Sequence, residues 1–66
     1  MTEMFKRIMK LKVQNNLEWE DICKGAKIRM KSWMTGIPGQ KPTDEEVHKL
    51  ADFLHSTFEW IKYGEK

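Results

Sequence analysis

Two prolines and two glycines fall within residues 36–42, so no helix or strand can run through the middle of the chain. The 66 residues are thereby divided into two halves, each of which has to be built from short elements. On both sides of this loop, apolar residues recur at the three- and four-residue spacing of amphipathic helices. No run alternates apolar and polar residues more clearly than it follows the helical spacing. The sequence therefore predicts an all-α fold, in a single domain over residues 1–66.

The spacing predicts five helices. The first covers residues 3–14, with Thr2 as its N-cap, and it ends at the turn residues Asn15 and Asn16. The others are expected over residues 19–26, about 29–35, from Thr43 onward, and about 56–64. Thr43 and Glu46 have the spacing of a capping box, which fixes the start of the fourth helix. One cysteine and two histidines provide neither an internal disulfide nor a zinc site, so a small apolar core has to stabilise the domain.

Basic side chains are distributed unevenly along a chain whose net charge is only +2. Residues 22–43 contain five basic and no acidic side chains, whereas residues 1–21 contain four of each and residues 44–66 contain six acidic and three basic ones. The five are Lys24, Lys27, Arg29, Lys31 and Lys41. Such a block is typical of a surface that binds a polyanion, and it also occurs as an ordinary solvated surface.

Residues that carry chemistry in enzymes and metal sites form no recognisable set. His48 and His55 lie seven positions apart, about 10 Å along a helix axis, which is too far for one metal ion. Cys23 falls on an apolar helix face and is expected to be a packed thiol. We expect no enzymatic activity, no metal and no cofactor. The longest run without charge, residues 32–40, is much shorter than the roughly 20 residues that cross a bilayer, so we expect a soluble, non-exported protein with no membrane partner.

The three tryptophans have different expected places. Trp33 and Trp60 fall on apolar helix faces and are expected in the core. Trp19 either packs on the first helix or lies at the surface, where its indole N–H reaches a phosphate or its ring meets a partner.

Two short helices followed by a loop and a capped helix resemble the helix-turn-helix of the phage Cro/CI-type repressor family. Nearly the whole chain takes part in the resemblance. Residues 17–23 stand where the family commonly has leucine, a capping residue, glutamine, two polar residues, leucine and alanine. Residues 39–43 resemble the glycine, basic residue, proline and serine before the family's fourth helix. Residues 56–65 resemble the Ser-Leu-Asp-Trp-Leu-Leu-Tyr-Gly ending of many phage CI-type repressor domains. The resemblance implies a compact five-helix lambda-repressor-like domain.

The chain departs from the family pattern at four places. Lys27 occupies the turn position where the family has a left-handed glycine, at a cost of about 1 kcal/mol, unless the turn uses Gly25. Trp19 replaces a glutamine that often binds phosphate, and Arg29 replaces a small N-cap residue. The pair at residues 37–38, Ile-Pro, predicts a third helix that is one turn shorter than in the family.

The resemblance implies a sequence-specific DNA-binding transcriptional regulator, a repressor of the Cro/CI type, that inserts its third helix into the major groove of double-stranded operator DNA. The residues implied to contact bases are Arg29, Met30, Lys31 and Met34. Those implied to contact phosphates are Trp19, Lys24, Lys27, Gln40 and Lys41. A homodimer, at least on DNA, is expected to use Phe58, Ile61 and Tyr63 of the last helix. The implied location is the cytoplasm of a bacterial host, with the protein encoded by a phage or prophage.

The alternative function is a protein-interaction module of the same fold. Such an antirepressor-like or inhibitory protein would bind another repressor or a host protein. Its adaptable surface would be rich in methionine, with Met4, Met9, Met30 and Met34 as candidates. The chain is either a free-standing Cro-like protein or the N-terminal domain of a longer repressor.

Overall fold

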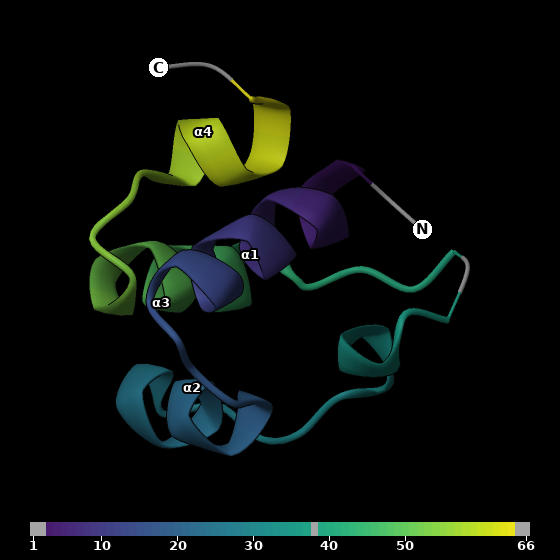
Figure 1. Cartoon of the computed structure of the whole chain (residues 1–66). Coiled ribbons are helices and arrows are strands. Elements are labelled where there is room, and N and C mark those ends of the chain that lie inside the picture. The colour runs from purple at the N-terminus through teal and green to yellow at the C-terminus, as the bar shows by residue number, and fades with distance from the viewer. Residues whose placement is uncertain (1–2, 38, 65–66) are drawn as a thin grey trace.

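The computed structural model describes residues 3–37 and 39–64. In these ranges it contains α-helices α1 (Glu3–Gln14), α2 (Trp19–Ala26), α3 (Asp44–Phe53) and α4 (Phe58–Tyr63), the 3-10 helix η1 (Ser32–Thr35), and no strand (Figure 1). The prediction of an all-α fold is confirmed. None of the described helices has the length and apolar character needed to cross a membrane.

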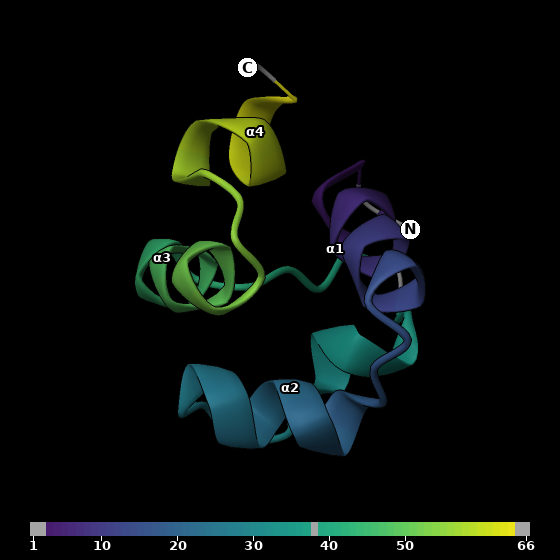
Figure 2. The ribbon, with the colours of Figure 1, turned by 60° about the vertical axis from the view of Figure 1, so that its left-hand side comes forward.

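Helix α3 occupies the middle of the fold. It contacts α2 on one side and α4 on the other, while α1 packs against α4 (Figure 2). The core lies between these helices and η1, and Ile8, Ile22, Val47, Leu50 and Ile61 have no exposed surface. Trp33 and Met34 bring η1 into the same core, with 3% and 2% of their surfaces exposed.

Local side-chain bonds explain where the helices begin. The predicted capping box is confirmed: the Glu46 N–H donates to Thr43 Oγ1 at 3.2 Å, and the Thr43 N–H donates to Glu46 Oε1 at 2.9 Å. Thr57 accepts from the Trp60 N–H, so α4 begins slightly later than predicted. The predicted turn after α1 is confirmed by Asn16, whose φ is +54°. The predicted cap at Thr2 lies outside the described residues.

The predicted α-helix over residues 29–35 is wrong, and with it the count of five helices. Residues 28–31 are not helical, and Lys31 is extended with φ −121° and ψ 156°, so only the single turn of η1 forms. The reason is the position of the apolar residues. Trp33 and Met34 are adjacent in sequence and both are buried, and Ile28, which packs against the core, precedes them by five and six positions. One face of an α-helix cannot bring all three inward, since its neighbours lie three and four residues apart.

Two local features determine how α2 packs on α3 and how α1 packs on α4. A Cβ at Gly25 would lie 2.0 Å from Phe53 Cε1, so this glycine lets α2 approach α3 closely. Arg7 of α1 donates from Nε to the Ile61 carbonyl at 2.8 Å and from Nη2 to the Lys62 carbonyl at 3.0 Å. The guanidinium thereby satisfies carbonyl groups at the C-terminal end of α4.

Candidate nucleic-acid interface

Residues 22–43, which contain no acidic side chain, are called the cationic segment below. The five basic side chains of this segment are all exposed. Lys24 lies in the last turn of α2, Lys41 lies in the loop before α3, and Lys27, Arg29 and Lys31 follow α2 directly. The turn after α2 is left-handed at Lys27, with φ 59° and ψ 46°, and its N–H donates to the Cys23 carbonyl. Lys27 thus adopts the left-handed conformation itself, and Gly25, the alternative turn residue, lies inside α2.

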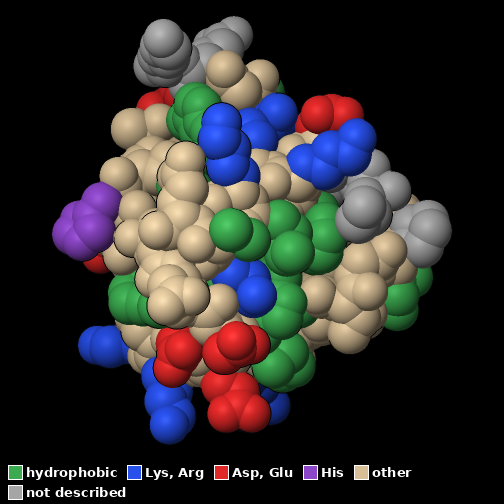
Figure 3. All heavy atoms as spheres, in the orientation of Figure 1, with side chains coloured by type: hydrophobic (Ala, Val, Ile, Leu, Met, Phe, Trp, Pro, Cys, Tyr) green, Lys and Arg blue, Asp and Glu red, His purple; other side chains and the backbone are tan. Residues whose placement is uncertain are grey.

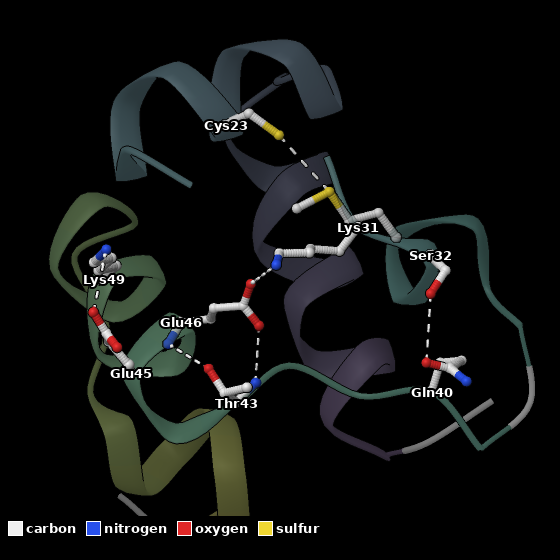
Figure 4. Close-up of polar contacts among 9 residues, drawn as sticks. Cys23, Lys31, Ser32, Gln40, Thr43, Glu45, Glu46 and Lys49 are labelled. Atoms are coloured by element: carbon white, nitrogen blue, oxygen red, sulfur yellow. Dashed lines mark hydrogen bonds and ion pairs between the residues drawn. The ribbon is translucent and has the colours of Figure 1, made fainter. Parts of the chain in front are cut away.

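An open hollow of about 270 Å³ lies between the chain that follows α2 and the first turns of α3. Its lining residues are Lys27, Ile28, Arg29, Lys31, Thr43, Glu45, Glu46 and Lys49. Lys31 reaches across toward Glu46, with 3.7 Å between Nζ and Oε2, and Lys49 lies beside Glu45 with 3.5 Å between Nζ and Oε1 (Figure 4). Among the described residues, neither Lys27 nor Arg29 forms an ion pair. The hollow therefore has more positive than negative charge.

Of the four predicted base contacts, the one assigned to Met34 is wrong. Met34 is 2% exposed, and its sulfur lies 3.8 Å from the Cys23 thiol, so it belongs to the core and cannot reach a base. Arg29 and Lys31 are exposed, as is Met30 with 55% of its surface accessible. All three lie within the non-helical stretch of residues 28–31, where the sequence predicted a helix.

Trp19, one of the predicted phosphate contacts, is half-buried. Its ring is stacked on Phe5 with centroids 6.0 Å apart and meets Trp33 edge-on at 5.8 Å, and Lys12 Nζ lies 5.5 Å from the ring centroid. Trp19 therefore takes the packing alternative, because aromatic neighbours cover its ring. Lys24, Lys27 and Lys41 are exposed, and so is Gln40, whose Oε1 accepts from the Ser32 hydroxyl at 3.4 Å.

Lys49 is the residue that sequence reasoning missed. It belongs to the acidic C-terminal third of the chain when charges are counted along the sequence, yet it lines the same hollow as Lys27 and Arg29. The sequence contained one signal for the position of Lys49: it follows Glu45 by four residues, which places both side chains on one helix face.

The predicted dimer surface is only partly accessible. Ile61 has no exposed surface and is a core residue, so its assignment to an interface is wrong. Phe58 is half-buried and stacks on His48, with ring centroids 4.2 Å apart, whereas Tyr63 is 59% exposed.

Lys62 belongs to the same surface. Its Nζ donates to Asp44 Oδ1 at 2.7 Å, and this hydrogen bond raises the pKa of the Lys62 ammonium.

The face of the molecule in Figure 3 bears charges of both signs. A group of acidic side chains gathers there over the N-terminal part of α2, with basic side chains nearby, so this view shows no uniformly cationic surface. In the described ranges, no three His, Cys, Asp or Glu side chains are arranged to hold a metal ion. Comparison of the chain with protein-family models, with curated proteins and with solved structures gave no significant match.

Proposed function

We propose that the protein binds double-stranded DNA through the cationic segment and acts there as a regulator of transcription. The observation that carries the proposal is that all five basic side chains of this acid-free segment are exposed. A DNA-binding surface needs such a group of cations because neutralising phosphates releases condensed counterions. The segment also runs from the last turn of α2, past η1, to the start of α3, so its charges belong to one continuous stretch of chain.

Phosphate contacts supply most of the affinity in this proposal. Lys24, Lys27 and Lys41 are exposed and form no ion pair among the described residues. Each of these three cations neutralises one phosphate in this proposal. Neutralising three phosphates gives a slope of roughly −2.7 for the logarithm of the binding constant against the logarithm of salt concentration.

Base contacts are left to Arg29, Met30 and Lys31, since Met34 is buried. Arg29 and Lys31 have the donors that recognise guanine O6 and N7, and Met30 has the apolar surface that packs on a thymine methyl group. These three side chains recognise few base pairs. Sequence-specific regulation by this protein therefore requires two copies on two half-sites about 34 Å apart.

The surface proposed for self-association is formed by Phe58 and Tyr63 on α4. Their rings meet edge-on with centroids 6.3 Å apart, and Lys62 Nζ lies 5.3 Å and 5.4 Å from the two ring centroids. Partly exposed aromatic side chains of this kind are enriched in protein interfaces.

A binding titration with charge reversals tests the proposal. A fluorescent duplex of random sequence is titrated with the protein at about 50 mM salt, and binding is followed by anisotropy. Lys41→Glu should weaken binding, and it should make the slope of the logarithm of the binding constant against the logarithm of salt concentration less negative by at least about 1. Lys10→Glu changes the net charge equally on exposed surface of α1, outside the cationic segment, and should have a much smaller effect. Equal losses in the two variants would mean that net charge, not this surface, is responsible.

One observation favours the second candidate, a protein-interaction module. Met30 and Ile37 lie on either side of η1 in the sequence and expose 55% and 47% of their surfaces, as an adaptable apolar contact requires. Ile37→Ser should remove binding of a protein partner and leave the salt slope on DNA unchanged.

A further inference from the structure

We infer that the hollow between residues 27–31 and the start of α3 is a seat for one phosphate of the nucleic-acid backbone, and that Lys49 of α3 is one of its ligands. This inference rests on the proposed DNA binding and extends it to a helix that lies outside the cationic segment. Three properties of the hollow support it, namely its shape, its charge and the geometry of its ion pairs.

The hollow has room for the group. Its volume of about 270 Å³ is several times the roughly 30 Å³ that one water molecule occupies in the liquid. Residues 27–31 form one wall and the first two turns of α3 form the other, so basic side chains line it from two elements. Figure 4 shows one of them from each wall, Lys31 and Lys49. The hollow is open to solvent, as the seat of a phosphate on a long polymer must be.

The charge of the lining favours a single anion. Lys27, Arg29, Lys31 and Lys49 stand against Glu45 and Glu46, which leaves two positive charges in excess. Removing the pairs of Lys31 with Glu46 and of Lys49 with Glu45 from this balance leaves Lys27 and Arg29. A phosphodiester has one negative charge, so the lining can accept it and remain attractive to the rest of the polyanion.

The two ion pairs in the hollow leave their ammonium groups available. Nζ to carboxylate distances of 3.7 Å for Lys31 and 3.5 Å for Lys49 exceed the roughly 2.7–2.9 Å of a charge-assisted hydrogen bond. Lys62, in contrast, donates to Asp44 at 2.7 Å and is committed to it. The Lys49 ammonium therefore keeps donors with which it can bind a phosphate oxygen, and the Lys31 ammonium keeps donors for the proposed base contact.

Glu45 and Glu46 also determine which phosphate binds. Two carboxylates on the wall weaken the attraction for a free anion, so an isolated phosphate ion binds poorly. A phosphate on a duplex that Lys24 and Lys41 already hold arrives at a high effective concentration. We therefore expect the seat to be filled by a polymer held at several points, and to contribute one unit of phosphate neutralisation.

Five variants that each neutralise one charge, at Lys49, Lys27, Lys41, Lys10 and Glu45, test the seat by anisotropy with a short random duplex at several salt concentrations. Lys49→Gln removes the positive charge of Lys49 on α3. Lys27→Asn removes the positive charge of Lys27 and introduces a residue that tolerates the left-handed turn. Lys10→Gln is the matched control on exposed surface of α1. Glu45→Gln gives a change of opposite sign, because it leaves Lys49 without its carboxylate partner.

The expected result is that Lys49→Gln and Lys27→Asn each weaken duplex binding about two- to fivefold. Each should also make the slope of the logarithm of the binding constant against the logarithm of salt concentration less negative by about 1. Lys10→Gln should change neither, and Glu45→Gln should strengthen binding. If Lys49→Gln and Glu45→Gln behave like the control while Lys41→Gln weakens binding, the seat is refuted and the proposed DNA binding stands. If the unmodified protein binds no duplex at about 50 mM salt, both are refuted. Tighter binding to vesicles of phosphatidylserine and phosphatidylcholine than to the duplex would also refute the nucleic-acid assignment.

Discussion

Lys31 and Glu46 join the cationic segment to the start of α3, with 3.7 Å between Lys31 Nζ and Glu46 Oε2. The other oxygen of the same carboxylate, Oε1, accepts the Thr43 N–H at 2.9 Å. Glu46 therefore has two separable roles, because it caps a helix and it offsets part of the positive charge of the hollow. Its side chain is only 11% exposed, so water screens neither contact fully.

Two substitutions of Glu46 should separate these roles. Glu46→Ala removes the partner of the Thr43 N–H and should lower the free energy of unfolding by about 1 kcal/mol. Glu46→Gln keeps an acceptor for the cap and removes the charge near Lys31, so it should preserve stability and strengthen duplex binding. Urea unfolding followed by circular dichroism, together with the duplex titration, measures both effects. Equal destabilisation by the two variants would show that the charge itself is needed for the fold.

Lys27 holds a left-handed conformation that glycine adopts without strain. Lys27→Gly should raise the free energy of unfolding by about 1 kcal/mol. Lys24→Gly, placed inside α2 only three residues earlier, should lower it by about the same amount, since glycine disfavours a helix interior. Thermal unfolding of the two variants provides the comparison, and a loss of stability in both would contradict the assigned turn.

Gly25 determines how closely α2 lies to α3. Gly25→Ala places a methyl group against the Phe53 ring and should lower the free energy of unfolding by about 1–3 kcal/mol. The double variant Gly25→Ala/Phe53→Leu should recover part of this loss, because the smaller side chain vacates the contact. Urea unfolding of the single and double variants measures the recovery. If Phe53→Leu only adds to the damage, the contact does not set the distance between the helices.

Burial raises the pKa of the Cys23 thiol, and the charge of Glu20 raises it further. Because the thiolate is the reactive form, the folded protein should react with iodoacetamide more slowly than the urea-unfolded chain at pH 8.5, roughly the ordinary thiol pKa. The same shift means that folding disfavours the thiolate, so stability is present below the ordinary thiol pKa and is lost as pH rises through the folded one. Alkylation rates at several pH values measure the difference, and equal rates in the two states would contradict it.

Short-range features of this fold could be predicted from the sequence. The capping box of Thr43 and Glu46 and the turn at Asn16 are decided by residues a few positions apart, and the predicted helices over residues 3–14 and 19–26 have the observed bounds. These features depend on backbone N–H groups and backbone conformations that a local sequence specifies.

Features that depend on the packing of distant elements could not be predicted in this way. The spacing of apolar residues on a six-residue helix such as α4 does not decide which of them turns inward, and contact with α1 and α3 buries Ile61 while Tyr63 stays exposed. Met34 is buried because η1 turns two adjacent residues into the core. Lys49 joins the hollow only because α3 lies next to the chain that follows α2.

The salt dependence of binding tests the central proposal most directly. Dissociation constants of the unmodified protein for a duplex of random sequence are measured between about 50 and 200 mM salt. If the cationic segment neutralises three phosphates, the logarithm of the binding constant should fall against the logarithm of salt concentration with a slope of roughly −2.7. No binding at the lowest salt, or a binding constant that does not change with salt, would contradict DNA binding by this surface.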